Sequence, residues 1–230
     1  MAPPPSAPPP GTRARILAAA AAEFGARGFD ATTVDRIARR GRVNKAMIYY
    51  HFQNKRALYT TIVRDHFTPV AERLAAIVAN PAPPDQQLDR LIAAIVESLE
   101  ASTYFLPIFL REIADGGVHL GLEELDRIAR IFATVTGVIV DGARQKIFRP
   151  VHPALAHFTL IGPLVMYRAS APVRARIKTI RHVDIQEADS AAIVQHLQMV
   201  ARRMLALGGA GEASGVNRAG GAGGASGADR

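Results

Sequence analysis

The sequence predicts an all-α protein in which an N-terminal three-helix domain precedes a larger helical bundle, with about nine helices in total. Apolar residues recur at spacings of three and four along most of the 230-residue chain, which is the period of an amphipathic helix. No segment shows the sustained alternation that is typical of a half-buried strand. Clusters of Gly and Pro, above all "NPAPPDQQ" at residues 80–87, separate the helical stretches.

The first helix is predicted over residues 12–26, because Ile16 and Phe24 lie on one face and glycines follow. A short second helix opens within "DATTVDRIARR". There Thr32, with Asp35 three residues later, resembles a capping box that has Asp in place of Glu.

A tight three-residue connection leads to a third short helix, which Asn44 can cap and on which Ile48 and Phe52 face the core. A long fourth helix is predicted over residues 54–79. Pro69 within it removes one backbone hydrogen bond, so we expect a kink there.

Five further helices are predicted, over residues 86–101, 103–115, 121–147, 153–170 and 189–207. The Pro-rich residues 1–11 and the Gly/Ala/Ser-rich residues 208–230 have compositions typical of disordered tails. The folded part is therefore divided into a first domain at 12–66 and a second at 67–207.

Positive charge is concentrated in the first domain. Residues 12–66 hold eleven Lys or Arg and four Asp or Glu, so they carry +7 of the chain's net charge of +8. Such a concentration is typical of proteins that bind polyanions, and a solvated basic face is the alternative interpretation.

Two short helices joined by a three-residue turn form a helix-turn-helix, which places its second helix in the major groove of DNA. With Ile48 and Phe52 facing inward, the aromatic rings and lysines of "NKAMIYYHFQNK" are free to meet a sugar-phosphate backbone and base edges. The alternative for Tyr49 or Tyr50 is that one of them packs in the core with Phe52.

The stretch "TTVDRIARRGRVNKAMIYYHFQNKRALY" resembles the DNA-binding signature of the tetracycline-repressor-like (TetR) family of bacterial transcription regulators. The matching positions are Thr32, Thr33, Ile37, Ala38, Val43, Asn44, Ile48, Tyr49, Tyr50, His51, Phe52 and Lys55. Two positions depart from the family pattern: Arg42 replaces the usual turn glycine, and Arg56 replaces an acidic residue. The resemblance implies a DNA-binding first domain and a second domain that dimerises and binds an effector.

Most of the expected DNA-binding residues are carried over from the family by position; Arg36 and Arg39 are added from helix geometry and Arg42 from its charge. The full set is Thr33, Arg36, Arg39, Arg42, Lys45, Ala46, Met47, Tyr49, Tyr50, His51 and Lys55.

Two late helices show heptad-like seams that predict an isologous four-helix dimer interface. The seam residues are Leu155, Phe158, Gly162, Val165, Ala169, Ile193, Leu197, Val200 and Met204. The alternative is that these helices form an intramolecular core.

Candidate effector-pocket residues are the aromatic, apolar and polar side chains Phe67, Tyr104, Phe105, Phe109, Arg111, Glu112, Phe132, Thr136, Met166 and Tyr167. This set favours a mostly apolar effector, although each residue has a core position as its alternative. Arg111 would favour an anionic ligand and a buried Glu112 a cationic one.

We expect no enzyme activity, cofactor or metal site. The chain has no cysteine, no HExxH and no GxSxG motif. It also has no apolar run near the ~20 residues of a membrane span, and the start "MAPPPSAPPPG" does not resemble a secretory signal, so we expect a cytoplasmic protein.

The leading hypothesis is a homodimeric regulator that binds an inverted-repeat operator as a repressor and is released by a small molecule. One alternative is an architectural DNA-binding protein whose second domain only dimerises. Another is a helical hydrolase or carrier whose basic face is incidental.

Overall fold

The computed structural model describes residues 11–102 and 104–207. The two tails that the sequence predicts to be disordered, 1–11 and 208–230, lie outside the described residues except for Gly11.

The described residues form ten helices and no strand, which confirms the all-α prediction. The helices are α1 (Thr12–Arg27), α2 (Val34–Gly41), α3 (Lys45–Phe52), α4 (Lys55–Ala79), α5 (Pro84–Glu100), α6 (Phe105–Ala114), α7 (Leu122–Arg144), α8 (Pro153–Ala169), α9 (Ala171–Arg181) and α10 (Ser190–Leu205).

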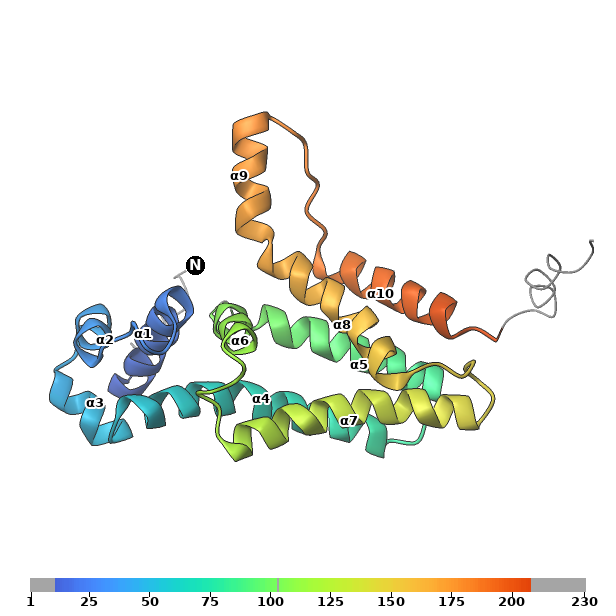
Figure 1. The fold of residues 1–230 in the computed structure, drawn as a ribbon, viewed down its shortest axis with the longest axis horizontal. Helices are drawn as coiled ribbons and strands as arrows, with labels where there is room; N and C mark the ends of the chain where they lie inside the picture. The colour runs from blue at the N-terminus through green and yellow to red at the C-terminus, as the bar shows by residue number, and fades with distance from the viewer. Residues whose placement is uncertain (1–10, 103, 208–230) are drawn as a thin grey trace, which may run out of the picture.

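The helix that the sequence analysis missed is α9. It begins two residues after α8 ends, with Pro172 in its first turn, where proline is compatible with a helix. None of its residues is buried, and it projects away from the bundle (Figure 1). Val173, Ile177 and Ile180 have the helical spacing of four and three, and all three are exposed.

The helices are arranged in two groups that α4 joins (Figure 1). Helices α1, α2 and α3 surround the start of α4 at one end of the molecule. The later part of α4 enters a bundle with α5, α7, α8 and α10. Helix α6 lies between α1 and this bundle, and it packs directly against α1.

The hydrophobic core around α1 includes side chains from beyond residue 66. Phe67, Phe105 and Ile108 are buried in the same cluster as Ile16 and Phe24. The predicted boundary between residues 66 and 67 is therefore not a boundary between hydrophobic cores, because side chains from both sides of it pack in this cluster.

The N-terminal cap of α2 corrects the sequence prediction by one residue. The hydroxyl of Thr33, not of Thr32, accepts a hydrogen bond from the Arg36 amide. Thr32 is fully buried, and its hydroxyl donates to the carbonyls of Glu23 and Gly28 at 3.1 and 2.7 Å. The predicted cap of α3 is confirmed, since the side chain of Asn44 accepts from the Ala46 amide at 2.9 Å.

The imidazole of His66 on α4 stacks on Phe105 and meets the edge of Phe67. Burial among these rings lowers the pKa of His66 to about 4. The unfolded chain therefore takes up a proton near the ordinary value of 6.5, while the folded protein does so only at lower pH.

We predict that the unfolding free energy falls as the pH is lowered from about 6.5 towards 4, because the unfolded state binds more protons in this window. His66→Phe should make this pH dependence shallower in urea titrations, whereas the exposed His196→Gln should leave it as in the wild type. Equal pH dependence in wild type and His66→Phe would contradict this origin.

Candidate nucleic-acid interface

The turn between α2 and α3 is tight and strained. Arg42 has φ 50° and ψ 47°, the left-handed conformation that glycine adopts without strain. Its amide donates to the carbonyl of Arg39 at 3.3 Å, and the Val43 amide donates to that of Ala38 at 3.0 Å. The helix-turn-helix is therefore formed with Arg42 in place of the usual glycine, at a cost of about 1 kcal/mol.

The inner face of this unit is anchored in the core around α1. Ile37 and Ile48 are fully buried, and Phe52 is 5% exposed. Tyr49 and Tyr50 are 45% and 79% exposed, so neither packs in the core with Phe52. Anchoring one face of α3 leaves its two tyrosines directed to solvent.

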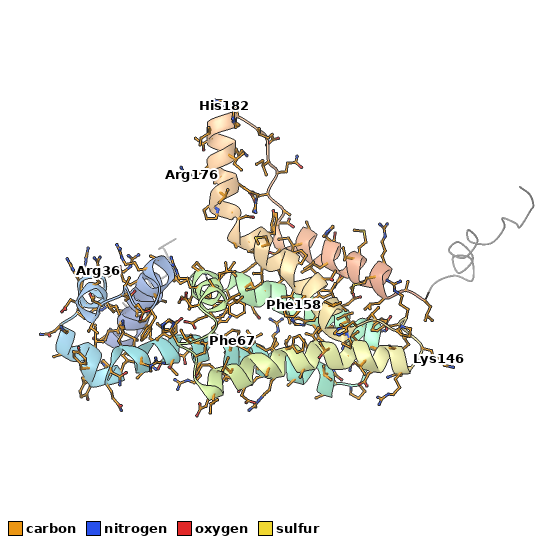
Figure 2. All side chains as sticks on the ribbon, viewed as in Figure 1. Arg36, Phe67, Lys146, Phe158, Arg176 and His182 are labelled. Carbon is orange, nitrogen blue, oxygen red and sulfur yellow. The ribbon has the colours of Figure 1, made fainter. Side chains whose placement is uncertain are left out.

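Exposed polar and basic side chains lie on α2 and α3, the helices of the same helix-turn-helix as these tyrosines. The predicted DNA-binding residues that are exposed are Thr33, Arg36, Arg39, Arg42, Lys45, Ala46, Tyr49 and Tyr50, and Arg36 is seen on the outer side of α2 (Figure 2). Met47 and His51 are half-buried at the edge of the same surface. Together these residues form a basic face at one end of the molecule, which we call the α2–α3 face.

Lys45, at the start of α3, forms an ion pair with Asp35 of α2 at 2.9 Å. The hydrogen bond to Asp35 raises the pKa of the Lys45 ammonium. Exposed ion pairs contribute little to stability, so Lys45 can exchange this partner for a phosphate at small cost.

Lys55 makes contacts within the protein that the sequence analysis did not predict. Its ammonium donates to the carbonyls of Phe29 and Thr32 at 2.9 and 3.0 Å, and it lies 4.2 Å from the centre of the Phe29 ring. These contacts hold the α1–α2 connection against the start of α4. We therefore expect Lys55 to position the α2–α3 face, and its contact with DNA stays a prediction.

The candidate effector residues lie in several separate places within the described part of the chain. Phe67, Phe105 and Phe109 belong to the core around α1. Tyr104 and Met166 are exposed. The other candidates contact residues of the protein itself. Phe132 packs against the rings of His157 and Phe158, and the Thr136 hydroxyl donates to the Phe132 carbonyl. The Tyr167 hydroxyl donates to Glu187.

Arg111 and Glu112 connect the two halves of the chain. The Arg111 guanidinium donates to the carbonyl of Ala26 at 2.9 Å. Glu112 is buried and accepts from the Tyr59 hydroxyl, and it lies 3.1 Å from a ring nitrogen of His119. Burial and this carboxylate raise the pKa of Tyr59. Because Glu112 is paired, its burial gives no reason to expect a cationic effector.

Within residues 11–102 and 104–207, no group of three His, Cys, Asp or Glu side chains could hold a metal ion. No single helix of this part is long and apolar enough to span a membrane; α5 and α6 meet the length and composition criteria only as a pair, bent by 101°.

A helix-turn-helix with an anchored inner face and a basic, aromatic outer face defines a DNA-binding protein. Residues 16–62 match the model of the family "Bacterial regulatory proteins, tetR family". The HTH-type transcriptional repressor SCO4008 of Streptomyces coelicolor is 27% identical over 172 residues, which cover 74% of this chain and 84% of that protein. Residues 16–62 therefore form a DNA-binding domain of the tetR type, and the chain is a DNA-binding transcriptional regulator.

Solved structures have the same fold. The ketosteroid regulator KstR2 of Mycobacterium tuberculosis aligns with a TM-score of 0.70 at 20% identity, over 87% of this chain and 98% of that one. AibR, solved with isovaleryl coenzyme A and operator DNA, aligns with a TM-score of 0.61 at 18% identity, over 83% and 97%. At these identities the likeness shows the fold alone.

We predict that Arg36→Ala flattens the slope of log K against log salt for DNA binding by about one unit, since one phosphate contact is lost. Lys55→Met should leave that slope unchanged and lower the unfolding free energy by about 1–3 kcal/mol, because two loop carbonyls lose a charged donor. Fluorescence anisotropy at several salt concentrations, with thermal melts, measures both. If the slope changes equally in the two variants, Lys55 contacts DNA.

Proposed function

We propose that this regulator is a repressor that binds an inverted-repeat operator as a homodimer through the α2–α3 face and is released by a small molecule. The observation that carries the proposal is an uncovered apolar face on α8, far along the chain from the basic face. The relatives SCO4008 of Streptomyces coelicolor, NicS of Pseudomonas putida and KstR2 of Rhodococcus jostii are named as repressors, which supports the direction of regulation.

The face that we propose for dimerisation differs in part from the predicted seams. Ile193 and Leu197 are 7% and 5% exposed and belong to the protomer's own bundle core, so they are corrected from interface to core. On α8, by contrast, Leu155 and Phe158 are 65% and 62% exposed, and Met166 is 67% exposed.

The rest of the predicted seam lies beside these side chains. Gly162, Val165, Ala169, Val200 and Met204 are half-buried. A Cβ added at Gly162 would meet nothing within 4 Å in the protomer, so packing inside one chain does not require glycine there. A close approach of a second α8 would require it, which supports a two-fold interface centred near this position.

A two-fold dimer presents two α3 helices to DNA with the same symmetry, and it therefore favours an inverted repeat. The two helices must lie about 34–36 Å apart to enter successive major grooves on one side of the duplex.

Two helices can transmit the effect of a ligand to the α2–α3 face. Helix α4 runs continuously through Pro69 from the first domain into the bundle. Helix α6 packs on α1, and Arg111 on it bonds to the end of α1. AibR, which shares the fold, is described in complex with isovaleryl coenzyme A and operator DNA, which supports a small-molecule effector.

We predict that Phe158→Arg gives monomers, because a second α8 cannot bury the charge. Gly162→Leu should also weaken dimerisation, because its side chain would fill the space that a second α8 needs. Light scattering and anisotropy on an inverted repeat measure the two effects. Dimers of both variants with wild-type operator affinity would exclude this interface.

We predict that a compound that stabilises the protein in thermal melts lowers its operator affinity by about 5–150-fold, the range of typical allosteric coupling. By linkage, operator DNA must weaken the compound's binding by the same factor. Calorimetric titration with and without the operator measures this. Equal affinities in both cases would favour a second domain that only dimerises.

A further inference from the structure

The structure contains a cavity of about 600 Å³ where the ends of α5 and α8 meet α6 and the start of α9. Its apolar wall consists of Leu99, Leu106, Pro107, Leu110, Ala169 and Pro172. Glu100 and Arg168 are its charged residues. This volume lies within the range of sites that hold small ligands, which is about 300–1,000 Å³.

The charged pair in this cavity is not balanced in its hydrogen bonding. Glu100 forms an ion pair with Arg168 and also accepts a hydrogen bond from the Ser190 hydroxyl. The Nε of Arg168 is buried, and it has no hydrogen-bond acceptor among the described residues. A guanidinium carries five N–H donors, so the cavity offers more donors than acceptors.

The second large cavity, of about 510 Å³ between α1, α4 and α5, lacks this feature. Its Arg73 and Glu97 bond to each other at 2.5 Å, and its Asp65 pairs with Arg64. Its charged groups therefore leave less for a ligand to satisfy.

We propose that the α5–α6–α8 cavity binds an amphipathic anion, with a carboxylate or phosphate head on Arg168 and an apolar chain along Leu99, Leu106 and Leu110. An anionic head supplies the acceptor that Nε lacks, and charge-assisted bonds of this kind are the stronger ones. The chain buries apolar surface, which contributes most of the affinity of such ligands. This inference rests on the proposed function only for its regulatory consequence.

The position of the cavity connects it to the DNA-binding end. Pro107 of α6 lines the cavity and also lies against Gly25 of α1. A Cβ built at Gly25 would lie 3.3 Å from the Tyr104 carbonyl oxygen and 3.7 Å from the Pro107 Cβ, so α1 and α6 approach closely here. A ligand that shifts α6 would therefore move α1 directly.

The binding test uses the full chain without DNA and four probes with the same chain: octanoate, octyl phosphate, octanol and octylamine. We expect at least one of the two anions to bind about tenfold or more tightly than octanol and octylamine in calorimetric titrations. The ratio of octanoate to octyl phosphate distinguishes a carboxylate site from a phosphate site.

Variants of the charged pair should change this preference in opposite directions. Arg168→Gln should reduce anion affinity about tenfold, to the level of octanol, while Glu100→Gln removes the internal competitor and should tighten anion binding. Arg176→Gln is the matched control, because Arg176 is exposed on α9, outside the cavity (Figure 2). If Arg168→Gln does not fold, the double variant E100Q/R168Q removes both charges and should lose the preference in the same way.

Equal binding of octanol and of the anions to the wild type would overturn the proposal, as would an anion preference that survives in Arg168→Gln or in the double variant. If the wild type does not bind an operator, or if an anion binds without changing operator affinity, the result counts against the proposed function. Neither result contradicts the anion site. The two failures are therefore distinguishable.

Discussion

The contact on which the rest of the structure depends is the packing of α6 against α1. The rings of Phe67 and Phe105 complete the core in which Phe24 is buried, and Arg111 caps the carbonyl end of α1. Helix α1 in turn supports α2, whose partner α3 carries the exposed tyrosines. The orientation of the basic face therefore depends in part on Phe105 and Arg111 of α6, which follow it in the chain by more than fifty residues.

The sequence predicted well what depends on local patterns. The periodic stretches gave the nine helices with a buried face, and the short apolar spacing of Ile48 and Phe52 placed the tyrosines outside. Helix α9 was not predicted, although Val173, Ile177 and Ile180 have helical spacing and differ from the other periodic stretches only in that none of them is buried.

Roles that depend on tertiary contacts could not be predicted in the same way. Lys55 has the charge of a DNA contact, but the nearby carbonyls of Phe29 and Thr32 bind its ammonium. A seam such as Ile193 and Leu197 has the same spacing whether its partner is in the same chain or in a second one. The excess of hydrogen-bond donors at Arg168 could not be predicted, because it depends on Glu100 and Ser190, which are ninety residues apart in the chain and meet beside Arg168.

The projecting helix α9 has a consequence for how the molecule opens. It has eleven residues, none buried, and an isolated helix of this length is marginal in water. Near the start of α9, Arg174 donates a hydrogen bond to Glu187, in the segment that connects α9 to α10, and lies over the ring of Tyr167. We therefore expect the amide protons of α9 to exchange with solvent through a local opening of low free energy, and those of the bundle core to exchange only when the whole domain unfolds.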